Sequence, residues 1–143
     1  LGFFMSEARF NIFITTFNLI KLKPLLGWGA GSFPIIFELY NGTFYSHSHN
    51  LPLQFAYDYG LPAAIILSFY IFWLIKKSIS IISKNGRSCI FDKAWNTSLV
   101  VLCASYFFDI NYYDSSLIII TWILLAGARG IIEENNQSLS NID

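Results

Sequence analysis

The sequence predicts an all-α fold, a polytopic helical bundle in a membrane, and three observations support this prediction. Hydrophobic residues make up 55% of the 143 residues and charged residues only 13%, about half the share found in soluble domains. The mean hydropathy of the chain is +0.51. The apolar residues gather in three long runs, at 61–75, 94–108 and 115–128. We therefore expect about three transmembrane helices, preceded by a loop region with short amphipathic helices.

The charge and the cysteine content exclude some classes of partner and fold. Nine basic and nine acidic residues give a net charge of zero, and the basic residues form no stripe. We therefore expect no nucleic-acid partner. Cys89 and Cys103 are too few for a disulfide framework, so we interpret them as packing residues.

The first element expected is an amphipathic helix over residues 7–22. Apolar side chains, among them Phe10, Ile14 and Phe17, recur there at spacings of three and four. Such a helix lies on a membrane surface or packs on other helices, while Ile12 and Thr16 fall toward another side.

The residues before this helix indicate that more of the protein precedes them. Residues 1–5 look like the last turn of an earlier membrane helix, and the sequence opens on Leu1 rather than methionine. We expect the chain to be the C-terminal part of a longer protein.

A glycine-rich loop follows, after Pro24 ends the helix. Gly27, Gly29 and Gly31 alternate in it, which allows tight turns and a close approach of the backbone to a ligand or to another segment. No Gly-Lys-Ser/Thr follows, and the spacing differs from a dinucleotide-binding fingerprint. A substrate loop and a simple tight connection both fit this pattern.

Both histidines of the chain, His47 and His49, lie in the next loop. Asn50 follows them as the expected N-cap of a short helix over residues 51–59, and Gly60 is its expected end. We therefore assign residues 1–60 to a loop region that carries an amphipathic helix and the histidine loop.

The three apolar runs and the tail complete the predicted organisation. Residues 61–129 are expected to hold the three transmembrane helices, the first of them extended beyond residue 75 by further isoleucines. Residues 130–143 are polar and are expected to form a disordered cytoplasmic tail.

Basic residues predict the orientation of the helices. Six of them flank one side of the three runs: Lys76, Lys77, Lys84, Arg87, Lys93 and Arg129. By the positive-inside rule this side is cytoplasmic, so the histidine loop faces outward, into the periplasm of a double-membrane bacterium. Lys21 and Lys23 fall on the outward side and oppose this rule mildly.

Few side chains in the predicted loop region are suited to chemistry. Arg9, His47 and His49 are the first candidates. The second group is acidic and consists of Glu38, Asp58, Asp109 and Asp114.

Three interpretations of the histidine pair stay open on residue types alone. A zinc site needs a third and usually a fourth ligand, and only carboxylates remain to supply them, so we expect no metal. A general base needs one imidazole, which can take a proton from a sugar hydroxyl while an arginine holds a pyrophosphate by bidentate hydrogen bonds. Alternatively, the histidines are structural loop residues, and Arg9 is a surface arginine whose stem lies along apolar surface.

Taken together, several segments of this chain are similar to the C-terminal part of the O-antigen ligase and polymerase superfamily. The similarity covers roughly residues 7–128. The segments that carry it are Arg9 in an apolar helix, Pro24-Leu-Leu-Gly-Trp-Gly-Ala-Gly-Ser-Phe33, Ser46-His-Ser-His-Asn50, Leu53-Gln-Phe-Ala-Tyr-Asp-Tyr-Gly-Leu61, and the acidic connection from Asp109 to Asp114.

The resemblance implies a multi-pass protein of the bacterial inner membrane that transfers a glycan from an undecaprenyl-pyrophosphate donor to an acceptor hydroxyl of a glycolipid or glycan. It implies His49 as the base, with His47 second or as a helper, and Arg9 as the pyrophosphate ligand. Gly27, Gly29, Gly31 and Asn50 would belong to the substrate loop. Neither a metal nor a cofactor is implied, and the bilayer is the remaining partner.

The chain departs from the family pattern in three places. The loop between Phe33 and His47 is short, Gly60-Leu-Pro-Ala63 replaces Gly-Leu-x-Gly, and a further arginine is expected outside this sequence, so the chain alone is expected to be inactive. Alternative functions are a bicarbonate-transporter-like member of the superfamily, a protein O-oligosaccharyltransferase and a structural membrane subunit. A transporter is expected to bury ionisable residues at mid-membrane, and the three apolar runs carry none there.

Overall fold

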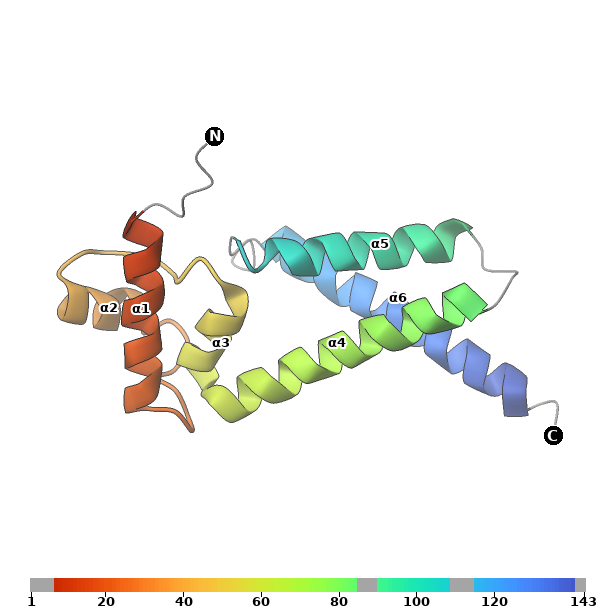
Figure 1. Ribbon diagram of the computed structural model, residues 1–143, viewed down its shortest axis with the longest axis horizontal. Coiled ribbons are helices and arrows are strands. Elements are labelled where there is room, and N and C mark those ends of the chain that lie inside the picture. Colours follow the sequence, from red (N-terminus) through yellow and green to blue (C-terminus); the bar gives the residue numbers. More distant parts are fainter. Residues whose placement is uncertain (1–6, 85–89, 109–114, 141–143) are drawn as a thin grey trace. The chain divides into compact units, whose positions relative to one another are not determined.

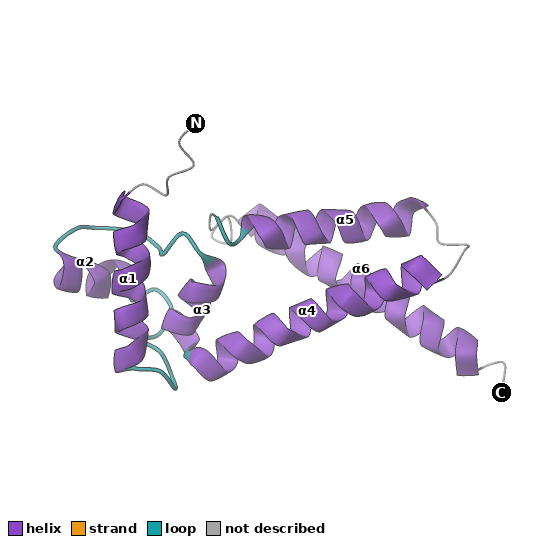
Figure 2. Ribbon diagram, in the orientation of Figure 1, coloured by secondary structure: helices purple, strands orange, loops and turns teal. Residues whose placement is uncertain are grey.

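The computed structural model describes residues 7–84, 90–108 and 115–140, and this part of the chain forms helices, loops and turns (Figures 1 and 2). The helices are α1 (Glu7–Leu22), α2 (Phe33–Asn41), α3 (Leu51–Tyr59), α4 (Leu61–Lys84), α5 (Ile90–Ser105) and α6 (Ser115–Ser140). The predicted all-α class is confirmed. Arg87, Cys89 and the acidic connection from Asp109 to Asp114 lie outside the described residues.

The chain divides into two compact units. Unit 1 contains the described residues 7–68 and 106–108, and unit 2 contains the described residues 69–105 and 115–140. Helix α4 begins in unit 1 and ends in unit 2.

An aromatic core holds unit 1 together. Phe33 and Phe37 of α2 are fully buried, as is Tyr57 of α3. The ring of Phe33 lies 5.1 Å from that of Phe37 and 5.0 Å from that of Tyr57, the latter at an interplanar angle of 76°. Edge-to-face pairs of this kind add to the stability that burial of the rings provides. Helix α1 packs against both of the short helices.

Helix α1 has apolar side chains on both of its sides. Its buried residues are Ile12, Thr16, Leu19 and Ile20, whereas Phe10, Ile14 and Phe17 remain 45–57% exposed. The sequence expectation that the apolar side of this helix lies on a membrane surface or packs on other helices stays a prediction. The Thr16 hydroxyl is accommodated in the core because it donates to the Ile12 carbonyl at 2.7 Å.

Among the described residues, two helices are long and apolar enough to cross a membrane, the stretches Leu61–Ser83 of α4 and Ser116–Gln137 of α6. Only 11% and 17% of these stretches are buried, unlike core helices of a soluble protein. The predicted extension of the first run is confirmed, since α4 reaches Lys84. Helix α5 has 16 residues, about 24 Å at 1.5 Å per residue, so its crossing of the membrane stays a prediction.

Polar and apolar contacts join the helices of unit 2. Leu74, Leu99 and Leu125 lie in one buried cluster with Ala128 and Ile132. The Ser78 hydroxyl of α4 donates to the side-chain carbonyl of Asn96 in α5. The Trp95 indole donates to the Leu124 carbonyl of α6 at 2.9 Å. Buried polar groups inside this unit are therefore satisfied by neighbouring helices.

The predicted disordered tail is wrong for residues 130–140, which continue α6 (Figure 1). Ile132 is 5% exposed because it packs in the buried cluster of unit 2. The Arg129 Nε atom and the Glu133 carboxylate form a 2.8 Å ion pair one helical turn apart. Packing and an i,i+4 pair thus extend the helix beyond the apolar run that the sequence makes visible.

Candidate functional site

The histidine loop is fixed in place by the start of α3. Asn50 is the N-cap of α3, as predicted, and its side-chain oxygen accepts a hydrogen bond from the Leu53 amide at 2.9 Å. Its side-chain nitrogen donates to the Phe107 carbonyl at 3.1 Å, and the Leu51 amide donates to the Tyr106 carbonyl at 2.9 Å. The side-chain oxygen and nitrogen of Asn50 are therefore both hydrogen-bonded within the protein. A contact between Asn50 and a substrate stays a prediction.

The two histidines lie next to each other. Their ring centroids are 4.3 Å apart with an interplanar angle of 67°. The His49 amide lies 3.4 Å from His47 Nδ1, which accepts its hydrogen bond. An Nδ1 that accepts leaves Nε2 to carry the proton of the neutral ring, so His47 presents a donor away from this contact.

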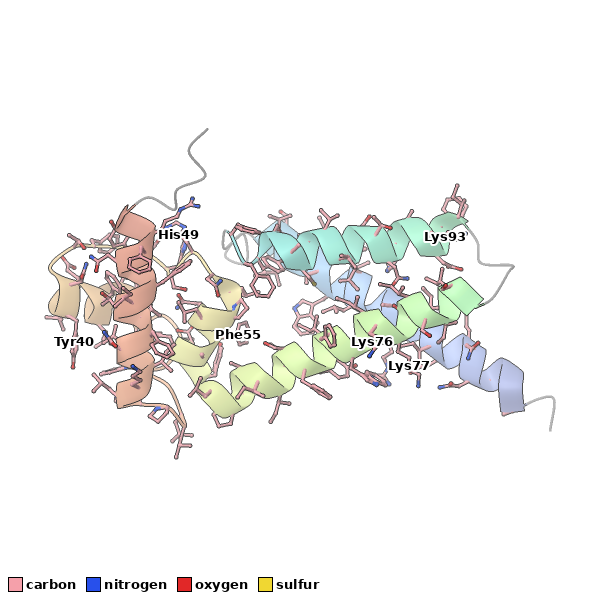
Figure 3. The ribbon with its side chains drawn as sticks, in the orientation of Figure 1. Tyr40, His49, Phe55, Lys76, Lys77 and Lys93 are labelled. Carbon is pink, nitrogen blue, oxygen red and sulfur yellow. The ribbon has the colours of Figure 1, made fainter. Side chains whose placement is uncertain are left out.

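His49 is the one described non-glycine residue with a positive φ, at 54°. A left-handed backbone costs an L-residue with a Cβ atom about 1–2 kcal/mol, and the surrounding structure must compensate for it. Backbone strain of this kind often marks functional positions. In the view of Figure 3, His49 lies toward the N-terminal end of α1. Arg9 belongs to the same end of this helix.

A chain of hydrogen bonds supports the residue between the histidines. Ser48 is fully buried, and its amide donates to Gln54 Oε1 at 2.9 Å. Gln54 Nε2 donates in turn to Asp58 Oδ1 at 3.1 Å. The Ser48 hydroxyl donates to the Asn50 carbonyl at 3.0 Å. Sequence reasoning missed both Ser48 and Gln54. The spacing of four between Gln54 and Asp58 could have indicated that these two side chains share one face of α3.

Asp58 is a buried carboxyl group, 7% exposed. Burial raises its pKa to about 6, although the hydrogen bond from Gln54 works in the opposite direction. Burial also raises the pKa of the Tyr57 phenol, whose oxygen lies 3.2 Å from Ser32 Oγ. Ionisation of Asp58 therefore costs free energy in the folded protein.

Stability should therefore fall as the pH rises through the range where Asp58 loses its proton. Its pKa is raised on folding, so its contribution is fully present below about pH 4 and is lost by about pH 6. We expect Asp58→Asn to be more stable than wild type at pH 7.5 by on the order of 1–2 kcal/mol, because asparagine keeps the acceptor for Gln54.

Thermal unfolding in detergent at pH 4 and pH 7.5 measures this effect. Glu38→Gln, which replaces an exposed carboxylate of α2, is the matched control and should leave the stability difference between the two pH values as in wild type. An Asp58→Asn protein that loses stability between the two pH values as steeply as wild type would contradict the assignment.

The glycine loop is tied to the far end of α3. The Trp28 amide donates to the Tyr57 carbonyl at 2.8 Å, and the Gly29 amide donates to the Asp58 carbonyl at 3.0 Å. A Cβ atom at Gly27 would lie 2.5 Å from the Tyr57 carbonyl oxygen, whereas one at Gly29 or Gly31 would meet nothing within 4 Å. Gly27 therefore serves packing, while the Cα atoms of Gly29 and Gly31 face open space.

The other predicted site residues lie apart from the loop. Arg9 is exposed near the start of α1, and Glu38 is exposed on α2. The structure thus gathers His47, His49 and Asn50 before α3 and supplies Arg9 from α1, which packs against α3. Within residues 7–84, 90–108 and 115–140, no group of three His, Cys, Asp or Glu side chains is placed to hold a metal ion.

Comparison with known proteins agrees with the similarity seen in the sequence. Residues 4–68 match the family model described as O-antigen ligase. The matched segment contains Arg9, the glycine loop, both histidines and α3. No curated protein and no solved structure matches the chain. The family match is confined to residues 4–68, and α4 and α6 are long and apolar enough to cross a membrane.

Proposed function

We propose that this chain, whose residues 4–68 match the O-antigen ligase family, is part of a membrane glycosyltransferase. It transfers a glycan from an undecaprenyl-pyrophosphate donor to an acceptor hydroxyl during assembly of a cell-surface polysaccharide. The observation that carries the proposal is that one matched segment holds an imidazole pair in the loop before α3 and an exposed guanidinium on α1, which packs against α3.

The proposed step needs one base and one anion ligand. An imidazole nitrogen of His49 takes the proton of the acceptor hydroxyl, and the acceptor oxygen bonds to the anomeric carbon of the donor glycan. The bond between that carbon and the pyrophosphate oxygen breaks, and undecaprenyl pyrophosphate leaves. Arg9 holds the leaving pyrophosphate, and His47 assists as a hydrogen-bond donor through Nε2. No metal is required for any of these steps.

The proposed location is the bacterial inner membrane, with the histidine loop on the periplasmic side. Support comes from Lys76 and Lys77 in the C-terminal half of α4 and from Lys93 in the first turn of α5 (Figure 3). Basic residues favour the cytoplasmic end of membrane helices.

The test is the surface glycan of a strain that lacks the gene. We expect either lipid-anchored polymer to be lost or its chain length to collapse, which separates a ligase from a polymerase. Loss of glycan from proteins with normal lipid-anchored polymer would indicate transfer to protein. An unchanged glycan profile on both lipid and protein would overturn the proposed function.

Complementation with Arg9 variants tests the pyrophosphate role. Lysine keeps the charge but cannot form the planar bidentate pair, so Arg9→Lys should retain a small part of the activity and Arg9→Ala almost none. We expect the loss in Arg9→Lys to appear mainly as a raised KM for the lipid-linked donor. Lys23→Ala, an exposed cation at the other end of α1, is the matched control and should keep full activity. Equal activity of Arg9→Ala and wild type would exclude the role.

A further inference from the structure

The turn between α1 and the glycine loop carries two leucines that point away from the protein. Leu25 is 71% exposed and Leu26 is 86% exposed, the largest value for a large hydrophobic side chain in the described residues. Exposed apolar side chains that cluster usually mark a surface with a partner. Leu22, the last residue of α1, is 56% exposed as well.

Hydrogen bonds hold this leucine turn, residues 23–27, in a defined shape. The Gly27 amide donates to the Lys23 carbonyl at 3.1 Å and closes the turn. The following residue, Trp28, donates its amide to the Tyr57 carbonyl and its indole N–H to the Leu19 carbonyl, both at 2.8 Å. The leucines are therefore presented by fixed backbone, and their exposure is not the result of a loose loop.

The leucine turn is bonded to the start of a candidate membrane span. The Leu61 amide, at the first residue of the span Leu61–Ser83, donates to the Pro24 carbonyl at 2.8 Å. Gly60 packs so closely on the Leu25 carbonyl that no side chain fits there. Because the first residue of a spanning helix lies near the boundary between headgroups and hydrocarbon, the leucine turn lies at that boundary too.

The charges around the leucine turn suit a lipid surface. Lys21 and Lys23 flank it, and residues 17–31 contain no carboxylate. The Lys23 ammonium lies 4.2 Å from the Trp28 ring centroid, and the Lys21 ammonium lies 4.5 Å from that of Phe17. Lysine and tryptophan beside apolar side chains are typical of the membrane interface, where the ammonium groups meet lipid phosphates.

We propose that the leucine turn inserts Leu25 and Leu26 into the outer leaflet of the bilayer beside the start of α4. This anchor fixes the height of α1 and the glycine loop above the hydrocarbon. It also explains why Lys21 and Lys23 lie on the side where the positive-inside rule expects few basic residues, since both bind headgroups. The inference depends on the membrane span and not on the proposed transfer reaction.

The test measures the depth of residue 26 in the full-length protein, reconstituted in vesicles of phosphatidylethanolamine and phosphatidylglycerol. Leu26→Cys is labelled with a polarity-sensitive fluorophore in a Cys89→Ser, Cys103→Ala background. Leu39→Cys, an equally apolar position that is 75% exposed on α2, is the matched control. In Figure 1, α2 lies on the side of unit 1 away from the start of α4.

We expect a blue-shifted emission at residue 26 and at least twofold stronger quenching by lipids with a spin label at carbon 5 of the acyl chain than at carbon 12. The label at residue 39 should emit as in water and resist both lipids. A blue-shifted label at residue 26 that no lipid quenches would mean a protein partner and would overturn the proposal. A water-like emission at residue 26 would overturn it as well. Because this measurement requires no glycan transfer, its result does not depend on the proposed transfer reaction.

Discussion

Replacing His49 is expected to reduce glycan transfer by at least about a hundredfold, because a positioned general base contributes roughly 10² to 10⁴ in rate. The structure shows how to make the replacement without disturbing the loop. His49 has a φ of 54°, a conformation that glycine and asparagine adopt at little cost and alanine does not. His49→Asn and His49→Gly therefore keep the backbone and remove the base, whereas His49→Ala keeps the strain that His49 already carries.

The measurement compares transfer rates and thermal midpoints of these three variants in purified, reconstituted protein. We expect all three to be inactive, and we expect His49→Asn and His49→Gly to unfold at a higher temperature than His49→Ala. His47→Ala should lose less activity, because His47 is assigned a hydrogen-bond donor role. Near-normal transfer by His49→Asn would eliminate His49 as the base, whatever its stability.

Local spacing in the sequence was sufficient to predict most of the elements near the site. Asn50 before Pro52 and Gly60 after Tyr59 predict the bounds of α3, since capping and helix termination depend on neighbours along the chain. The long apolar helix α4 was predicted from composition, because most of its surface is exposed and few of its residues depend on packing partners.

Features that depend on distant residues were not predicted. The packing of Ile12 and Thr16 in the core was not predicted, because the choice between two apolar faces of α1 depends on where α2 and α3 pack. The Ser48–Gln54–Asp58 chain was missed because a serine amide gives no signal in a sequence. The end of α6 was misplaced because Ile132 packs against helices that lie far from it in the chain.

The glycine loop illustrates the same limit, because three alternating glycines look equivalent in the sequence. In the structure Gly27 and Gly29 both have a positive φ, at 69° and 95°. Only Gly27 lies against backbone, with the Tyr57 carbonyl oxygen and the Asp58 carbonyl group 2.5–2.6 Å from where a Cβ atom would be. Backbone atoms cannot rotate away from a new methyl group, so the loop must separate from α3 to make room.

We therefore expect Gly27→Ala to be the most destabilising single change in the loop, by about 3 kcal/mol or more. The cost combines strain at positive φ with loss of the Trp28–Tyr57 and Gly29–Asp58 backbone bonds. Gly29→Ala should lower the free energy of unfolding only by the strain at positive φ, about 1 kcal/mol. At roughly 2–4 °C per kcal/mol, the two variants should differ by about 4–8 °C in thermal midpoint in detergent.

The same pair of variants separates packing from substrate contact. If Gly29 leaves backbone open to the donor, Gly29→Ala should raise the KM for the lipid-linked glycan while the protein stays folded. Gly27→Ala should lower the amount of folded protein, and the folded remainder should keep a normal KM. Equal thermal midpoints for the two variants would contradict the close approach of Gly27 to α3. An unchanged KM in Gly29→Ala would remove this glycine from the predicted substrate loop, because its Cβ atom would then meet neither protein nor ligand.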